Sequence, residues 1–278
     1  MKTLQEQPEK IGKFFPLPHS DAAPRSPDGL RVSEREYWEK YYEYVGDNDH
    51  IFEWNDGVLE ERPVSNHQSY LMFEWFYPLL REYLKTNPVA EIFGTDLGFR
   101  LPLPHKTVIR RPDLSLVLNT NPVRFAPSDR SYAGIFDICL EFLSDSTKKD
   151  IERDTVEKKS EYSHGGVTEY FILDRLGRET AFYHMNRRGF YSPIRPVRGG
   201  VIRSGVLPGF QFREQDLYTR PSFRQLADDP VYSPFVLKDW QDERSKAEDE
   251  RKRANEAEEK ARNLAEKLRE LGIDPENF

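Results

Sequence analysis

The clearest hydrophobic pattern along the chain alternates with period two in two neighbouring segments. In residues 108–118, one face of an extended chain would carry three leucines and the other would carry Asp113. In residues 135–143, one face would carry only apolar side chains and the other would carry Glu141. We predict two strands that place Asp113 and Glu141, respectively, on the face that points away from the main core.

Other patterns predict the elements around these strands. Ser33 and Glu36 have the spacing of a capping box, which predicts a helix over 33–45. Asp56–Gly57 between two apolar runs predicts a tight hairpin over 50–62. The remaining predicted elements are a helix over 66–85, strand signals over 89–101, a charged helix over 147–165, a strand over 167–174, and hairpin strands around Gly177 and Gly189. The segment 205–212 closes the body.

The tail has a different periodicity. Small and apolar residues recur every seven positions, which predicts a short coiled coil or a lone charged helix. The repeating residues are Trp240, Ala247, Ala254, Ala261 and Leu268, followed at an offset of three by Ala257, Leu264 and Leu271. We therefore expect a loosely packed or disordered arm (1–30), one α/β domain (31–220), a linker (221–237) and a charged coiled-coil helix (238–278).

Composition narrows the class of protein. A single cysteine, Cys139, excludes an internal disulfide framework and a cysteine-rich zinc site. No stretch has the roughly 20 apolar residues of a membrane span, and the start lacks a signal-peptide pattern, so we expect a cytoplasmic protein without a membrane partner. The net charge of −7 argues against nonspecific coating of nucleic acid. Two basic stretches, 100–111 and 185–203, are candidates for phosphate contacts, and solvated loops are the alternative.

The two strand carboxylates are the main candidates for chemistry. Asp113 and Glu141 would lie on adjacent strands, and two buried carboxylates need a proton or a cation. A hard divalent cation such as Mg²⁺, or alternatively Mn²⁺, suits oxygen ligands. Lys158 on the following helix could orient a water or stabilise developing negative charge. Lys159 would take this role in place of Lys158 if the other face of the helix points to the site. The alternative for Asp113 is an acid at the end of a strand that faces solvent.

Three further residues are candidates for substrate contacts or for supporting the site. They are His67, Glu53 and Asp96. The Glu-x-Lys motif at Glu157–Lys159 lies on a predicted helix, where positions i and i+2 point about 200° apart. This motif is therefore excluded as the partner of Asp113.

These residues and their order resemble a known class. An α-β-β-β-α-β order with an acid on two strands and a nearby lysine resembles the PD-(D/E)XK nuclease superfamily, which has a restriction-endonuclease-like fold. Within it the chain resembles the Uma2 family of endonucleases. The stretches that carry this resemblance are "FEWNDGVLEERPVSNHQ", "GFRLP", "RRPDLSLVL", "CLEFLSDST", "EKKSEYSHGGVTEYFILD", "LPGFQF" and "LRELGIDPE".

The resemblance implies roles for individual residues. Asp113 and Glu141 would be metal ligands, the main-chain carbonyl of Phe142 would be another ligand, and Lys158 would be the active-site lysine. The chain departs from the superfamily at Leu143, which stands where the lysine usually follows the acid on the same strand. Lys158 on the helix is therefore the residue that we assign to this role.

The sequence thus predicts a mixed α/β nuclease domain that hydrolyses phosphodiester bonds with Mg²⁺. Family analogy favours DNA over RNA as the nucleic-acid substrate. The alternative is a catalytically inactive nucleic-acid-binding or scaffold protein of the same fold that oligomerises through its C-terminal helix. Symmetric dimers are the commonest assemblies, so we expect a homodimer.

Overall fold

Two β-sheets with helices packed against them form the body of the chain. A computed structural model describes residues 26–43, 50–63, 66–94, 97–144 and 147–271. The larger sheet has the order β11 (Tyr191–Pro193), β10 (Ala181–Met185), β9 (Glu169–Leu173), β8 (Ile138–Phe142), β6 (Leu114–Leu118) and β3 (Ala90–Phe93). The second sheet has the order β2 (Val58–Glu61), β1 (Phe52–Asn55), β5 (Thr107–Arg110), β4 (Gly98–Pro102) and β7 (Ser131–Tyr132), and β12 (Val201–Arg203) pairs with β13 (Gln211–Arg213).

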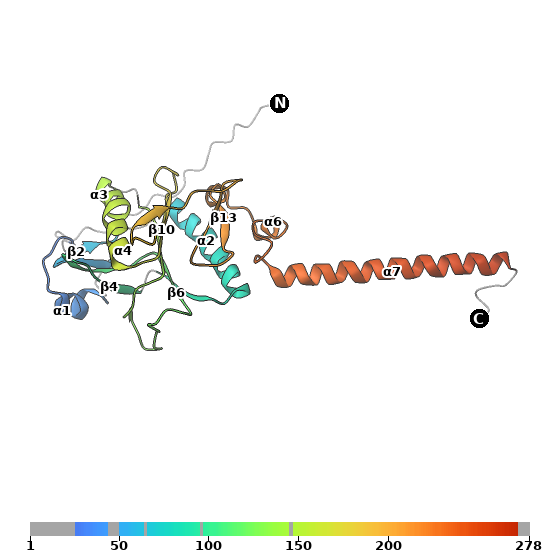
Figure 1. Cartoon of the computed structure of the whole chain (residues 1–278), viewed down its shortest axis with the longest axis horizontal. Helices are drawn as coiled ribbons and strands as arrows, with labels where there is room; N and C mark the ends of the chain where they lie inside the picture. The colour runs from blue at the N-terminus through green and yellow to red at the C-terminus, as the bar shows by residue number, and fades with distance from the viewer. Residues whose placement is uncertain (1–25, 44–49, 64–65, 95–96, 145–146, 272–278) are drawn as a thin grey trace, which may run out of the picture.

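Helices cover these sheets and extend beyond them (Figure 1). One helical segment, which we call the crossover helix, runs from 148 to 165 as α3 (Lys148–Glu152), the π-helical η2 (Arg153–Lys158) and α4 (Lys159–Gly165). The other helices are α1 (Glu34–Glu36) with the π-helical η1 (Tyr37–Tyr41), α2 (His67–Thr86), α5 (Asp216–Thr219), α6 (Phe223–Ala227) and α7 (Lys238–Glu270).

The larger sheet confirms the predicted mixed α/β core. In chain order, α2 is followed by β3, β6 and β8, then by the crossover helix and β9. Strands β3, β6 and β8 are antiparallel neighbours, whereas β8 and β9 are parallel. Parallel strands need a long connection, which the crossover helix provides.

The predicted strand over 108–118 is wrong in one respect, because it consists of two strands in different sheets. Strand β5 ends at Arg110 and β6 begins at Leu114. Pro112 lies in this break, where its missing N–H cannot take part in a ladder. The prediction for 89–101 divides in the same way, into β3 and β4. Asp113 therefore lies at the point where the chain passes from one sheet to the other.

The predicted alternation of side chains in β6 and β8 is confirmed. Leu114 pairs with Leu140, and both pack in the apolar cluster that includes Phe76 of α2. Cys139 and Leu143 on the opposite face belong to a second cluster beneath the crossover helix. Both faces of the sheet are thus covered, and Glu141 is 2% exposed.

The hairpin predicted at Asp56–Gly57 joins β1 and β2. Both turn residues have positive φ, 47° and 95°, which matches the twist of a tight hairpin. Residues 29–32, partly within the segment expected to be an arm, hydrogen-bond along this hairpin through Gly29 N to Leu59 O and Val32 N to Gly57 O, each at 2.9 Å. Residues 1–25 of that expected arm lie outside the described residues.

The segment 221–237 was expected to be a linker, but it is packed against the body. It contains α6, and its buried residues Tyr232, Phe235 and Val236 belong to the same apolar cluster as α2. Their apolar side chains explain the difference, since a solvated linker would leave them in water.

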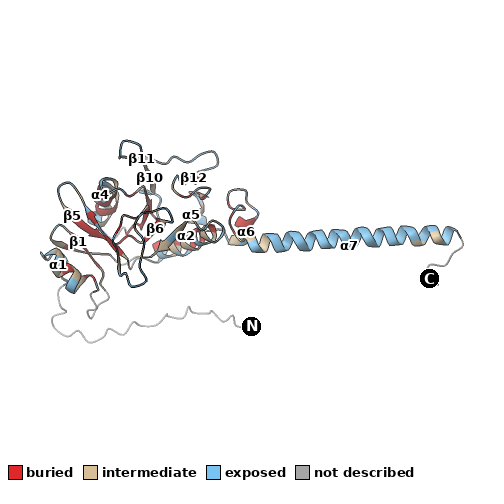
Figure 2. Cartoon of the chain, turned by 60° about the horizontal axis from the view of Figure 1, so that its bottom comes forward, coloured by how far each residue is buried: buried red, intermediate tan, exposed pale blue. Residues whose placement is uncertain are grey.

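Helix α7 projects away from the body (Figure 1) and is exposed along almost its whole length (Figure 2). At its start, Asp239 pairs with Lys85 at 2.5 Å and Arg244 pairs with Asp228 at 2.7 Å. None of the helices in the described residues is long and apolar enough to cross a membrane.

Candidate active site

Asp113 and Glu141 meet where β6 begins beside β8. The main-chain N–H of Phe142 donates to Asp113 Oδ2 at 2.7 Å, so the two acids are tied to adjacent positions of paired strands. The other carboxylate oxygen of Asp113 is held by the guanidinium of Arg62, which follows β2. The two predicted acids therefore lie together.

Lys158 reaches the same point from the crossover helix. Its Nζ lies 3.0 Å from Glu141 Oε1, 3.2 Å from Glu53 Oε1 and 3.3 Å from Asp154 Oδ1, and the residue is 2% exposed. Lys159 instead lies over the ring of Tyr183, 4.2 Å from its centre. Lys158 belongs to the π-helical part η2, and such turns occur often at functional sites.

Tyr162 provides a second contact to the same carboxylate. It lies one turn after Lys158, and its hydroxyl donates to Glu141 Oε1 at 2.9 Å. Lysine and tyrosine, four residues apart, thus hold one oxygen of Glu141 from the same helix face.

Glu53 connects the cluster to a fully buried arginine. Its Oε1 also accepts from the main-chain N–H of Arg111 at 2.9 Å, and its Oε2 lies 3.1 Å from Arg110 Nη1. Arg110 Nε donates to Glu161 at 2.7 Å, and another of its nitrogens contacts Glu60. The candidate Glu53 therefore holds Lys158 together with Glu141.

Burial and crowded charges shift the acids of this cluster in different directions. Burial raises the pKa of Glu141 to about 8; nearby Lys158 opposes this rise, and Asp113 and Asp154 add to it. Burial also raises the pKa of Asp154. Burial would raise the pKa of Glu53 as well, but Lys158 and Arg110 outweigh it and hold that pKa well below its usual range. Glu141 and Asp154 thus lie where more positive charge would favour ionisation.

A small cavity lies between these groups. Its volume is about 20 Å³, close to the space that one water molecule or ion occupies. Its walls are formed by Arg62, Pro63, Asp113, Glu141, Phe142, Ser144, Arg153, Asp154 and Lys158.

The donor chemistry of this cavity fits a hard divalent cation. Three of its lining residues are carboxylates. Within the described part of the chain, the buried Asp154 Oδ1 accepts no hydrogen bond, although it lies 3.3 Å from the charged Nζ of Lys158. Among the residues that the structure describes, no group of three or more His, Cys, Asp or Glu side chains is already arranged to hold a metal. Arg62 contacts Asp113, so a cation bound by Asp113 would have to replace Arg62 at that carboxylate.

One other candidate, His67, does not join the cluster. His67 is exposed in the first turn of α2 and is not among the described residues that line the cavity. Asp96 lies outside the described residues.

Sequence reasoning missed four charged residues of the cluster: Arg62, Arg110, Arg153 and Asp154. Asp154 had a local signal, because it lies one helical turn before Lys158. Arg62 and Arg110 had none, because their acidic partners are about 50 residues away in the chain. The acidic partner of Arg153 is Asp150, three residues before it on the same helix.

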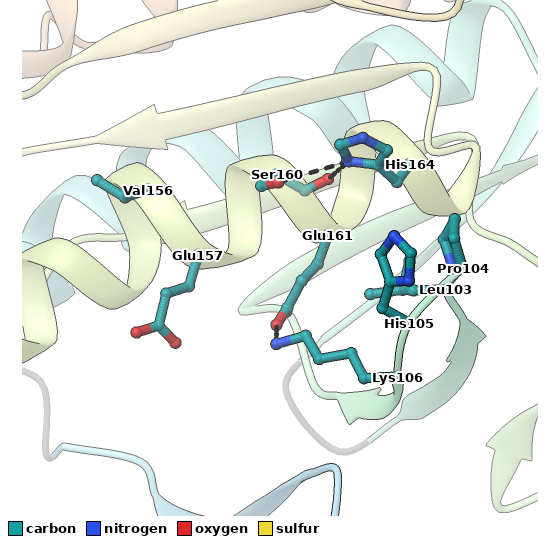
Figure 3. Close-up of a pocket in the computed structure, with 9 residues that line it drawn as sticks. All are labelled: Leu103, Pro104, His105, Lys106, Val156, Glu157, Ser160, Glu161 and His164. Atoms are coloured by element: carbon teal, nitrogen blue, oxygen red, sulfur yellow. Dashed lines mark hydrogen bonds and ion pairs between the residues drawn. The ribbon is translucent and has the colours of Figure 1, made fainter.

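A larger surface pocket lies on the outer side of the crossover helix, between α4 and the loop after β4 (Figure 3). Its volume is about 460 Å³, and it is lined by Leu103, Pro104, His105, Lys106, Val156, Glu157, Ser160, Glu161 and His164. Glu161 reaches across it to Lys106 at 2.6 Å. Asp113, Glu141 and Lys158 are not among its lining residues, so the pocket is separate from the acidic cluster.

The larger sheet thus brings Asp113 and Glu141 together at paired strands, with Lys158 of the crossover helix beside them. The family model of Uma2, described as "Putative restriction endonuclease", matches residues 38–217. The chain therefore belongs to the Uma2 family.

No curated protein matches the chain. Among solved structures, the crystal structure of "a putative nuclease belonging to DUF820" from Anabaena variabilis ATCC 29413 is similar, with 12% identity and a TM-score of 0.49. The match covers 63% of this chain and 94% of that one.

Proposed function

We propose that this protein is a Mg²⁺-dependent endonuclease that hydrolyses phosphodiester bonds, with DNA as its substrate. The observation that carries the proposal is the convergence of Asp113, Glu141 and Lys158 on one small cavity. Membership in the Uma2 family, described as "Putative restriction endonuclease", supports the reaction class.

Each residue has a role that follows from its surroundings. Asp113 and Glu141 would hold Mg²⁺, or Mn²⁺ in its place, and the bound cation would supply Lewis-acid polarisation and a more acidic water. Lys158, fixed by Glu53 and Asp154, would orient the attacking water and stabilise charge on the phosphorus oxygens. Tyr162 would keep Glu141 in position.

The two basic stretches of the sequence differ in how many of their cations are free to contact DNA. In the stretch 100–111, the cations are used within the fold, since Arg100 pairs with Glu34 at 2.7 Å and Arg110 is buried. In the stretch 185–203, five arginines are exposed and form no ion pair with any described residue. They are Arg187, Arg188, Arg195, Arg198 and Arg203. This surface is the one we propose to contact the DNA backbone.

A catalytically inactive scaffold of the same fold is the second candidate. The contact of Arg62 with Asp113 favours it, because the acid is already neutralised without a metal. In either case we propose that the heptad residues of α7 join two copies into a homodimer.

A thermal-melting titration of the full chain with Mg²⁺, together with nicking of plasmid DNA, separates the two candidates. A nuclease should melt at a higher temperature as Mg²⁺ is added, since the cation binds only the folded state. Asp113→Asn should abolish both this rise and the nicking while the metal-free protein stays folded. Glu157→Gln, at an exposed acid of the same helix as Lys158, is the matched control and should keep both.

The metal assignment fails if Asp113→Asn and Glu141→Gln respond to Mg²⁺ as the unchanged protein does. A rise in melting temperature without nicking of DNA would favour the scaffold.

A further inference from the structure

Two arginines line the cavity beside the acids, and the proposed roles of Asp113, Glu141 and Lys158 leave them unused. Arg62 holds one oxygen of Asp113. Arg153, at 5% exposure, donates from Nη1 to the main-chain carbonyl of Glu61 at 3.0 Å, and its Nη2 lies 3.4 Å from Asp150. The guanidinium of Arg153 is thus anchored at the end of β2, the strand that Arg62 follows in the chain.

Arg153 has a donor that the fold does not use. Its Nε is buried and donates to no acceptor in the residues that the structure describes. A buried donor without an acceptor costs free energy, so such groups usually mark a place where a ligand or water binds. The cavity beside it is the place where that acceptor would sit.

The charges of the residues that line the cavity indicate the sign of the charge that this ligand would carry. Three acids and three bases line the cavity, so their formal charges balance. The acids are Asp113, Glu141 and Asp154, and the bases are Arg62, Arg153 and Lys158. Adding a divalent cation leaves a positive excess, which favours an anion in the same space.

We infer that Arg62 and Arg153 form a phosphate subsite, in which Arg62 exchanges Asp113 for a non-bridging oxygen of the scissile phosphodiester. This inference rests on the proposed function and adds the residues that hold the substrate. When Asp113 turns to the cation, Arg62 loses its carboxylate, and a buried guanidinium without a partner is costly. A phosphate oxygen supplies the replacement, and the planar fork of arginine suits it.

This exchange of partners at Arg62 makes the binding of the metal and the binding of the phosphodiester cooperative. Metal binding releases Arg62 for the phosphodiester, and the phosphodiester stabilises Arg62 away from Asp113. Each ligand must then strengthen the binding of the other by the same factor.

Calorimetric titration of the full chain with Mn²⁺, with and without dimethyl phosphate, tests this coupling. Dimethyl phosphate is a small phosphodiester that serves as the substrate probe. In the unchanged protein it should tighten Mn²⁺ binding by about fivefold or more. In Arg62→Gln, Mn²⁺ alone should bind more tightly than in the unchanged protein, and dimethyl phosphate should have no effect.

Cleavage of plasmid DNA gives the second measurement. Arg62→Gln and Arg153→Gln should each lower kcat/KM by roughly 10- to 100-fold, the range expected when a hydrogen bond to a charged group is removed. Arg62→Lys keeps the charge without the fork and should recover part of the activity. Lys149→Gln, which removes an exposed cation of the same crossover helix, should change neither measurement.

The outcomes separate this inference from the proposed function. If the unchanged protein binds Mn²⁺ and cuts DNA, but dimethyl phosphate leaves its Mn²⁺ affinity unchanged, the subsite is wrong and the nuclease stands. Unaltered kcat/KM in Arg62→Gln overturns the subsite in the same way. If the unchanged protein neither binds Mn²⁺ nor cuts DNA, the proposed function is wrong and the subsite falls with it.

Discussion

At the scale of single residues, two adjacent lysines offer an internal comparison. Lys158 lies within 3.3 Å of three carboxylates, whereas Lys159 contacts the ring of Tyr183. We predict that Lys158→Met lowers the rate of DNA cleavage by about 100-fold, because it removes a preorganised charge beside the reacting group. Binding of Mg²⁺ should not weaken, since a competing cation is removed. Plasmid nicking and Mg²⁺-dependent melting measure the two effects.

Lys159→Met is the control for this prediction and should keep nearly full cleavage activity. A large decrease in Lys159→Met with little decrease in Lys158→Met would show that the wrong lysine has been assigned.

Glu161 provides a prediction for stability against pH. Burial would raise the pKa of its carboxyl, but Arg110 and Lys106 outweigh burial and hold the pKa below its usual range. An acid with a lowered pKa stabilises the fold above the pKa of the unfolded chain, about 4.3, and loses this contribution as the pH falls through the folded value. Glu161→Gln should therefore lower the free energy of unfolding by about 3 kcal/mol at pH 7.

Urea unfolding of both proteins at pH 7 and near pH 4 checks this prediction. The difference between them should shrink at the lower pH, because the acid of the unchanged protein is then losing its charge. Glu157→Gln on the exposed side of the same helix should change the stability by less than about 0.5 kcal/mol. A difference that grows on acidification would contradict the role given to Arg110.

At the scale of elements, the arginines between β10 and β11 give a prediction for DNA binding. Arg187 and Arg188 are exposed in the turn between these strands, and Phe190 beside them is 59% exposed. Replacing both arginines with glutamine should weaken DNA binding at low salt. The slope of log affinity against log salt should become shallower by about 0.9 for each phosphate that the variant no longer neutralises.

Fluorescence anisotropy of a labelled duplex over a range of salt concentrations measures this slope. Replacing Arg251 and Arg253 of α7 with glutamine removes the same charge from another exposed surface and should leave the slope unchanged. Equal slopes for the unchanged protein and the Arg187/Arg188 variant would show that this turn does not touch DNA.

Local pattern was enough to predict most of the elements. The hairpin at Asp56–Gly57 and the alternation in β8 depend on neighbouring residues, which a sequence displays directly. The division of 108–118 between two sheets does not depend on neighbouring residues, because it is set by the strands that pair with β5 and β6 from elsewhere in the chain.

The same distinction between local and distant interactions applies to the candidate site. Asp113, Glu141 and Lys158 were predicted from their positions along strands and a helix. Arg62 and Arg110 could not be predicted in this way, because folding alone brings them to their acidic partners.

At the scale of the whole molecule, most of α7 does not pack against the body (Figure 2). Leu264 is 60% exposed and Leu271 is 73% exposed, and both belong to the heptad pattern. We predict that Ala261→Glu combined with Leu268→Glu reduces a homodimer to a monomer, since like charges would face each other across the seam. Mg²⁺-dependent melting of the body should be unchanged.

Light scattering of the full chain at matched concentrations measures the mass per particle. Asn263→Glu adds a charge on α7 outside the seam and should keep the dimer. Truncation before residue 238 should give a monomer, as the seam variant does. If the unchanged protein and the seam variant have equal mass, the heptads do not set the assembly. The ion pairs Arg244–Glu248 and Glu258–Arg262 along α7 would then favour a lone charged helix.

The length of α7 also sets a distance for the proposed dimer. A helix of 33 residues that rises 1.5 Å per residue is about 50 Å long. If two copies pair in parallel, both bodies lie at the same end and can act on opposite strands at neighbouring base pairs. If they pair antiparallel, the bodies lie at opposite ends, separated by about 15 base pairs of B-DNA. The orientation of the two helices would then determine the spacing between the two cuts, so α7 would act as a ruler along the DNA.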